Sequence, residues 1–279
     1  MGRLLVARPD AALKTALAED PGLRNHYVEF CDTTVEALRL VRDRAVDVLI
    51  TDPTTPGKDD LTIAAEIRII RPSARIIALA PAVSHEDLVN ALRAHVFAVF
   101  TPPLDYGEIV GMARAALDTV NWRDGIEVVS ALPNWMTLRV SCHLLTADRL
   151  VRFMTEHEQS LPLGERDLLL TAFREMLVNA MEHGAGFDPG QVIEVTAART
   201  DRAIVFHIRD PGNGFNREAV SHAAKANDPD SVMHAMENRE AAGLRSGGFG
   251  MLIVRQVVDE MVYNERGNEV LLIKHLKKE

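Results

Sequence analysis

The sequence predicts two units: a doubly wound α/β unit with a five-stranded parallel sheet, and then an α+β unit. Over about the first 120 residues, β-rich runs alternate with helix-period stretches, which indicates a parallel sheet covered by helices. Beyond residue 135 the strands and helices are grouped instead. A chain of 279 residues is long enough for two domains. We assign residues 1–120 to the first domain, 121–135 to a linker and 136–279 to the second domain.

Five β-rich runs predict the strands of the first domain, at 3–7, 26–30, 46–51, 74–79 and 96–100. The helix-period stretches between them cover 10–20, 34–44, 60–70, 84–94 and 105–120. The run at 46–51 is apolar on consecutive residues, as expected for a strand that is buried on both faces. Ser84 followed by Asp87 is typical of a capping box at a helix start.

Gly125 and Pro133 interrupt this rhythm, which is why we interpret 121–135 as the linker. The expected strands of the second domain cover 135–142, 191–199, 203–210 and 268–276. The expected helices cover 146–159, 165–183 and 250–261. A long polar stretch, 211–247, separates the third strand from the last helix.

The composition excludes several classes of protein. A net charge of −9 argues against direct binding to nucleic acid or to an anionic membrane, since such binders usually carry a basic patch. No apolar stretch approaches the roughly 18 residues of a membrane span, and the first residues lack a signal-peptide pattern. Cys31 and Cys142 are far apart and show no metal-ligand spacing. We therefore expect a cytoplasmic protein without a disulfide framework.

The helix around "FREMLVNAMEHG" carries polar side chains along one edge. Glu175 and Asn179 are four residues apart and share a helix face, and His183 follows one turn later. A buried carboxylate is costly unless it is paired or binds something, so Glu175 and Asn179 are candidate ligand-binding residues. We expect Glu182 to lie on a solvated edge, and His183 to cap the helix end beside Gly184.

Two further segments contain glycines typical of a ligand site. In "RDPGNGF", Asp210 ends a strand, and Gly212 and Gly214 permit positive φ and a close approach of backbone to ligand. In "SGGFGMLIVRQVVDEM", Gly248 and Gly250 open a helix, whose free N–H groups suit a phosphate. This segment is neither a Walker loop nor a dinucleotide fingerprint.

Together, "EMLVNAMEHG", "RDPGNGF" and "GGFGMLIVRQVVDEMVYNERGNEV" resemble the ATP-binding (Bergerat) domain of histidine kinases, gyrase, the Hsp90 chaperones and MutL. The resemblance is greatest to anti-sigma-factor serine kinases and covers about residues 136–276. It implies an α+β sandwich that binds ATP and Mg²⁺. By this resemblance Glu175 is the catalytic base, Asn179 binds both ATP and Mg²⁺, and Asp210 reads the adenine amino group.

The resemblance also implies roles for the glycines and for the polar stretch. Gly212 and Gly214 would shape the nucleotide pocket, and Gly248 and Gly250 would hold the phosphates. Residues 215–247 would form a lid that nucleotide orders. The sequence departs from the family at Phe249, where a polar or basic residue is common, which puts one phosphate contact in doubt.

The first domain resembles the flavodoxin-like receiver domain of response regulators. In "VDVLITDPTTPG", Asp52 stands where the phosphoacceptor is expected. The supporting residues differ: Arg8-Pro9 replaces the acidic pair, with Asp10 just beyond, and the usual hydroxyl and lysine positions hold Ala80 and Pro102. Phosphoryl transfer needs charge neutralisation by metal and lysine. We therefore favour a docking or dimerisation module over an Asp52 that an upstream histidine kinase phosphorylates.

The resemblances imply an Mg²⁺-ATP-dependent protein serine/threonine kinase of the anti-sigma-factor type, regulated by the receiver-like domain. Its expected partners are a small anti-sigma-factor antagonist of the STAS type or a sigma factor, and the expected assembly is a homodimer. One alternative is an ATP-gated binding module without phosphotransfer. Another is an atypical histidine kinase that lacks its own dimerisation helices, for which His157 in "MTEHEQSL" is a weak candidate phosphorylation site.

Overall fold

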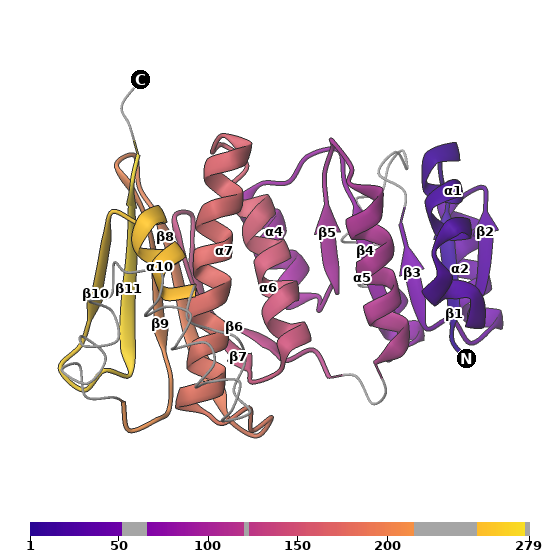
Figure 1. The fold of residues 1–279 in the computed structure, drawn as a ribbon. Coiled ribbons are helices and arrows are strands. Elements are labelled where there is room, and N and C mark those ends of the chain that lie inside the picture. The colour runs from indigo at the N-terminus through magenta and orange to yellow at the C-terminus, as the bar shows by residue number, and fades with distance from the viewer. Residues whose placement is uncertain (52–65, 120–122, 215–249, 277–279) are drawn as a thin grey trace. The chain divides into compact units, whose positions relative to one another are not determined.

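The computed structural model describes residues 1–51, 66–119, 123–214 and 250–276 (Figure 1). The chain divides into two compact units, Met1–Asp124 and Gly125–Glu279. Each unit has its own sheet and its own buried core. Among the described residues, no helix combines the length and the apolar character needed to cross a membrane.

The sheet of the first unit has five parallel strands in the order β2-β1-β3-β4-β5. The strands are β1 (Arg3–Ala7), β2 (Tyr27–Cys31), β3 (Val48–Ile50), β4 (Arg75–Leu79) and β5 (Ala98–Phe100). This order confirms the predicted doubly wound flavodoxin-like sheet. The order reverses between β1 and β3, and in such sheets ligands bind outside the carboxyl ends of the strands at that point.

Helices connect these strands where the sequence predicts them. The described helices are α1 (Ala11–Glu19), α2 (Thr34–Asp43), α4 (His85–Arg93) and α5 (Tyr106–Asp118), with a short 3₁₀ turn, η1 (Pro21–Asn25). The expected helix at 60–70 is described only from residue 66. The capping box is confirmed, because Ser84 and Asp87 exchange side-chain to backbone hydrogen bonds at the start of α4.

The second unit has a six-stranded antiparallel sheet in the order β10-β11-β9-β8-β7-β6. The strands are β6 (Ile126–Leu132), β7 (Trp135–Ser141), β8 (Val192–Arg199), β9 (Ala203–Arg209), β10 (Glu260–Tyr263) and β11 (Glu269–His275). The helices are α6 (Leu144–His157), α7 (Leu163–Asn179) and α10 (Gly250–Val257). A π-helical turn, η2 (Ala180–Gly184), continues α7.

Helices α6, α7 and α10 lie over one face of this sheet (Figure 1). Along β7, β8 and β9 every second residue is buried, as expected when one face of a sheet packs against helices. The rings of Phe173 on α7 and Phe206 on β9 join the two layers, with centroids 4.5 Å apart. This layering confirms the predicted α+β sandwich.

Two strands were not predicted. Almost half of the expected linker, residues 126–132, is β6, which pairs with β7 across a turn at Pro133 and Asn134. The expected helix at 250–261 ends early, because after Val257 the chain turns into β10 and the Asp259 N–H bonds to the Ile273 carbonyl of β11. Apolar residues recur without a break from the helix into the strand, so the pattern did not indicate where the helix ends.

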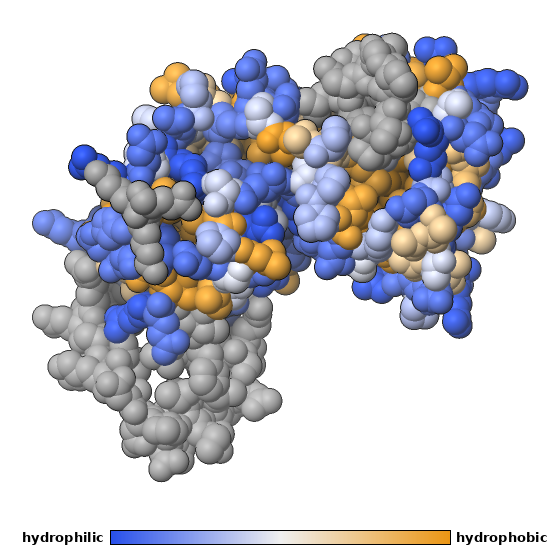
Figure 2. Space-filling view, turned by 90° about the horizontal axis from the view of Figure 1, so that it is seen from above, coloured by the Kyte–Doolittle hydropathy of each residue, from blue (hydrophilic) through white to orange (hydrophobic). Residues whose placement is uncertain are grey.

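The surface mixes residue types, and hydrophobic residues are interspersed among hydrophilic ones on the face that Figure 2 shows. Isolated exposed apolar side chains are normal for soluble domains. In the second unit, the side of the sheet away from the buried face carries polar side chains such as Arg139, Thr196 and His207. Those positions alternate with the buried ones, which is typical of a sheet with one solvated face.

Candidate functional site

The helix that carries Glu175 and Asn179 ends in a widened turn. α7 runs to Asn179, and residues 180–184 continue it as the π-helical turn η2 instead of the regular helix we expected over 165–183. Glu175 and Asn179 are both half-buried. The Asn179 Nδ2 lies 3.9 Å from the Met176 Sδ, and the Oδ1 oxygen has no hydrogen bond to another described residue. π-helical turns frequently occur at functional sites.

The Glu175 carboxylate has no hydrogen bond or ion pair to another described residue. Its neighbour Arg174 differs, since that guanidinium donates to Asp148 at 2.8 Å. A half-buried carboxylate with unengaged oxygens can accept a proton or a hydrogen bond from a ligand. Glu175 therefore has the freedom that a catalytic base requires.

Asp210 follows directly after β9 and is half-buried. Burial raises the pKa of its carboxyl above the ordinary value, while the Gly212 N–H and the positive charge of Arg266 partly oppose that rise. The Gly212 N–H donates to the Asp210 Oδ1 at 2.8 Å. The hydrogen bond fixes one carboxylate oxygen and leaves the other available to a ligand.

Gly184 and Gly212 bring the end of the helix against the Asp210 loop. A Cβ on Gly184 would lie 2.2 Å from the Asp210 Cγ, and a Cβ on Gly212 would lie 2.7 Å from the Gly184 carbonyl oxygen. Only residues without a side chain allow this approach. The helix end that carries Asn179 and the loop that carries Asp210 therefore form one continuous wall, which we call the glycine cradle (residues 184 and 210–212).

Gly184 is the last residue of η2 and does not adopt a left-handed conformation. The left-handed residues that end the helix are Gly186 (φ 59°) and Phe187 (φ 53°), whereas Gly184 is a glycine because Asp210 occupies the space of a side chain. The expected cap by His183 is not seen among the described residues, where its exposed side chain has no hydrogen bond.

The remaining glycines are described only in part. Gly214 has φ 77°, the positive value that the sequence led us to expect. Gly250 begins α10, which packs against α7. Gly248, Phe249 and the predicted lid at 215–247 lie outside the described residues.

His157 and its neighbours form a cluster of charged residues that sequence reasoning missed. The His157 Nδ1 lies 2.6 Å from the Glu158 carboxylate, and both side chains are almost completely buried. Arg199 also pairs with Glu158, and Arg152 pairs with Glu156 within α6. A buried and bonded imidazole is poorly placed to receive a phosphoryl group, which argues against His157 as a phosphorylation site. Only the Arg152–Glu156 spacing hinted at this cluster.

In the first unit, the switch point carries altered receiver chemistry. Asp10 caps α1 by accepting from the Leu13 N–H at 2.7 Å, and it also accepts from the Tyr106 hydroxyl. The hydrogen bond from Tyr106, and to a smaller extent that from Leu13, holds the pKa of Asp10 below its ordinary value. The cis peptide bond lies at Pro102–Pro103, so Pro102 occupies the position where receivers carry lysine. Asp52 lies outside the described residues.

Residues 143–274 match the family model of the histidine kinase-like ATPase domain. The matched stretch contains α7, η2 and the glycine cradle. The second unit is a histidine kinase-like ATPase domain. The matched range includes Glu175, Asn179 and Asp210.

The ATPase domain and the first unit each resemble curated proteins. The serine-protein kinase RsbW of Staphylococcus epidermidis is 31% identical over 112 residues, 39% of this chain and 64% of that protein. The transcriptional regulator NtrC of Azospirillum brasilense is 29% identical over 116 residues, 42% of this chain. The chain spans only 24% of the length of NtrC.

Solved receiver domains resemble the first unit. A CheY-like receiver from Methanospirillum hungatei is 19% identical, with a TM-score of 0.37, and covers 42% of this chain and 94% of the receiver. A response regulator from Clostridium difficile is 17% identical, with a TM-score of 0.38, and covers 44% of this chain and all of the regulator. The strand order of the first unit is that of a flavodoxin-like doubly wound sheet.

Proposed function

We propose that this chain is an Mg²⁺-ATP-dependent protein serine/threonine kinase of the anti-sigma-factor type, regulated by its receiver-like unit. The observation that carries the proposal is the glycine cradle, in which Gly184 closes on Asp210 at the end of the helix that carries Glu175 and Asn179. The similarity of the ATPase domain to a serine-protein kinase supports the reaction type.

The residues of the cradle suit adenine recognition. Asp210 has one oxygen held by the Gly212 N–H and another available, so it would accept a hydrogen bond from the adenine amino group. Because Gly184 and Gly212 have no side chains, the helix end closes on Asp210 and would hold its carboxyl in place for the base. Gly214 would line the same pocket, and Gly248 and Gly250 would hold the phosphates with backbone N–H groups at the start of α10.

Asn179 suits a magnesium ion. Because its Nδ2 is turned to the Met176 sulfur, its Oδ1 would supply the hard oxygen ligand that Mg²⁺ prefers. The bound ion would neutralise charge on the phosphates. Asn179 would thereby orient the nucleotide, and the half-buried wall of α7 would exclude water from the same side.

Glu175 would act as the general base. Its carboxylate takes the proton of the substrate Ser or Thr hydroxyl as that oxygen bonds to the γ-phosphorus, the bond to the β-γ bridging oxygen breaks, and ADP leaves. The unengaged oxygens of Glu175 fit this role. Positioning and electrostatics supply most of the rate enhancement in such transfers.

The expected substrate is a small anti-sigma-factor antagonist of the STAS type, with a sigma factor as a second partner, and the working form is a homodimer. We propose a cytoplasmic location, which fits two buried cysteines without a disulfide. The receiver-like unit would serve as a docking module, because the lysine position is Pro102 and Asp10 is engaged as a helix cap. A stoichiometric beryllofluoride or acetyl-phosphate adduct at Asp52 would reverse that assignment.

The test of the kinase is transfer of γ-labelled ATP to an antagonist protein. The variant E175Q is expected to keep ATP affinity and to lose about a hundredfold or more of the transfer rate. E182Q is the matched control, since Glu182 is half-buried on the adjoining turn and has no assigned role. Unchanged transfer by E175Q would reject the base. A nucleotide-dependent complex without label would instead favour the ATP-gated binding module, and acid-labile label would favour a histidine kinase.

A further inference from the structure

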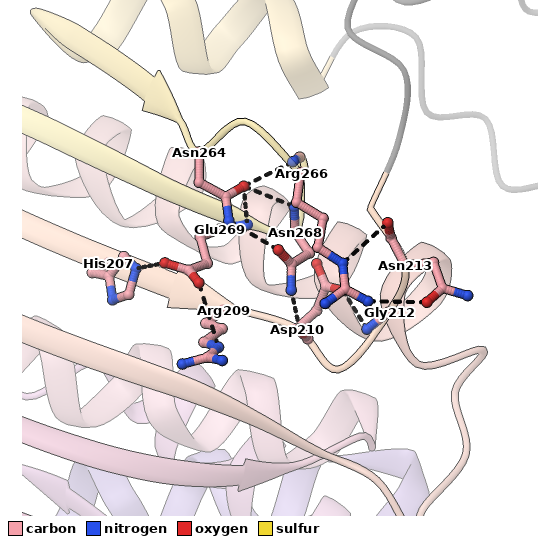
Figure 3. A network of polar contacts seen from close by, with 10 residues as sticks. His207, Arg209, Asp210, Gly212, Asn213, Asn264, Arg266, Asn268 and Glu269 are labelled. Carbon is pink, nitrogen blue, oxygen red and sulfur yellow. Dashed lines mark hydrogen bonds and ion pairs between the residues drawn. The ribbon is translucent and has the colours of Figure 1, made fainter.

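The turn between β10 and β11 is closed by hydrogen bonds to the side chain of Asn264. The Asn264 Oδ1 accepts from the backbone N–H of Gly267 at 2.7 Å and of Asn268 at 3.1 Å, and Gly267 has φ 80° (Figure 3). Asparagine side chains commonly close turns in this way. These residues belong to the segment "YNERGNEV", to which the resemblance attached no role.

Asn268 is hydrogen-bonded to both the backbone N–H and the backbone carbonyl of Asp210. The Asp210 N–H donates to the Asn268 carbonyl at 3.0 Å, which continues the antiparallel pairing of β9 and β11. The Asn268 side chain then donates from Nδ2 to the Asp210 carbonyl at 3.1 Å and accepts from the Asn264 Nδ2 at 2.9 Å. Asn268 is 5% exposed, so its amide is a buried polar group with both ends bonded.

Arg266 extends the contact beyond the end of the strands. Its Nη2 donates to the Asn213 Oδ1 at 3.0 Å, and its Nε lies 3.4 Å from the Asn213 carbonyl oxygen. Gly214 packs so closely that a Cβ there would lie 1.8 Å from the Arg266 carbonyl oxygen. Figure 3 shows Arg266 between the turn and the loop that carries Asp210 and Asn213.

These contacts exceed what a hairpin turn needs. Asn264 alone closes the turn, and the strand ladder alone accounts for the bond between the Asp210 N–H and Asn268. The Asn268 amide and the Arg266 guanidinium instead reach residues that follow β9 and belong to the candidate base-reading loop.

We propose that Asn268 and Arg266 are positioning residues that hold the 210–214 loop in the conformation in which Asp210 selects adenine. This inference rests on the proposed function, because it assigns selectivity within the same nucleotide site. Asn268 fixes the position of the Asp210 backbone, and Arg266 fixes the positions of Asn213 and Gly214. Neither side chain needs to touch the nucleotide.

The test compares the affinities for ATP and for inosine triphosphate, whose base lacks the 6-amino group. The wild type is expected to prefer ATP, and D210N is expected to lose this preference. N268D removes the Nδ2 donor without changing the size of the side chain, and we expect the ATP-to-inosine preference to fall about tenfold. The added charge would weaken the binding of both triphosphates alike, so it does not alter the ratio of the two affinities.

N134D is the matched control, because Asn134 is exposed in the β6–β7 turn of the same sheet. It should keep the wild-type ratio. R266Q, in which the altered side chain lies at the surface, should lower the ratio in the same direction as N268D but by a smaller factor, and should speed amide exchange at 210–214. If N268D does not fold, the ATP-to-inosine ratio of R266Q tests the positioning role.

The outcomes separate the two proposals. If the wild type prefers ATP and D210N does not, but N268D and R266Q keep the full preference, the positioning role is wrong and the nucleotide site stands. If R266Q is the only variant that folds and its ratio is unchanged, the positioning role is likewise wrong. If the wild type binds neither triphosphate, or binds both equally, the proposed site fails and the inference fails with it.

Discussion

Asp210 lies where burial opposes the ionisation of its carboxyl and raises its pKa, and its proposed role is to accept a hydrogen bond from the adenine amino group. Burial raises the pKa of the carboxyl, and the opposing influences of the Gly212 N–H and Arg266 are smaller. Groups whose environments oppose their ionisation concentrate at functional sites. The sequence identified this aspartate from its place at a strand end before two glycines, but its burial depends on Gly184, which is 26 positions away in the chain.

Replacing Asp210 by asparagine should therefore leave the protein at least as stable at pH 7 as the wild type. Because the folded pKa is raised, ionisation costs stability above that pKa, and the cost disappears as the pH falls through it toward the ordinary value of 3.8. The asparagine Oδ1 can still accept from the Gly212 N–H. Urea denaturation at pH 7 and pH 4 measures the difference between D210N and wild type, which should shrink at the lower pH.

The matched control is D201N, since Asp201 is exposed in the β8–β9 turn. It should show no such pH-dependent gain. A D210N protein that is clearly less stable than the wild type at pH 7 would contradict the assignment of burial as the dominant influence on Asp210.

At the scale of elements, the regular pattern was predictable and the irregular elements were not. All five strands of the first unit and the layering of the second follow from alternating hydrophobic periods. β6 was missed because Gly125 and Pro133 were interpreted as signs of a linker. Pro133 instead begins a hairpin turn. The widening of α7 into η2 left no trace in the periodicity, and the turn lies against the Asp210 loop, which is far away in the sequence.

The closure of η2 onto the Asp210 loop predicts the effect of adding one methyl group. G184A would place a Cβ where the Asp210 carboxyl lies, so the loop must move. We expect ATP affinity to fall about tenfold or more while the fold persists. G164A on α7 is the control, since a Cβ there meets nothing within 4 Å and should slightly stabilise the helix. Calorimetric titration gives both affinities, and an unchanged value for G184A would contradict the cradle.

At the scale of the whole molecule, the two units each contain one buried thiol, Cys31 in the first and Cys142 in the second. Burial, reinforced by nearby carboxylates, raises the pKa of each to about 11. At neutral pH both cysteines are therefore protonated and inaccessible, and such thiols react slowly. They provide one natural reporter of opening for each unit.

We expect neither thiol to react with Ellman's reagent in the native state at pH 7.5, and both to react in urea. In C31S and C142S variants the remaining thiol reports one unit alone. ATP with Mg²⁺ should slow the labelling of Cys142 more than that of Cys31, because a ligand acts first on the stability of the unit that binds it. Equal protection of both thiols, or none at Cys142, would count against a nucleotide site confined to the second unit.

An ATP titration with and without Mg²⁺ shows directly whether Asn179 and Asp210 line one nucleotide site. The wild type should bind ATP more tightly with Mg²⁺. N179A should lose most of that Mg²⁺ dependence, D210N should weaken binding with or without Mg²⁺, and the turn variant N134D should match the wild type. Wild-type affinity and Mg²⁺ dependence in both N179A and D210N would show that these residues do not line a nucleotide site.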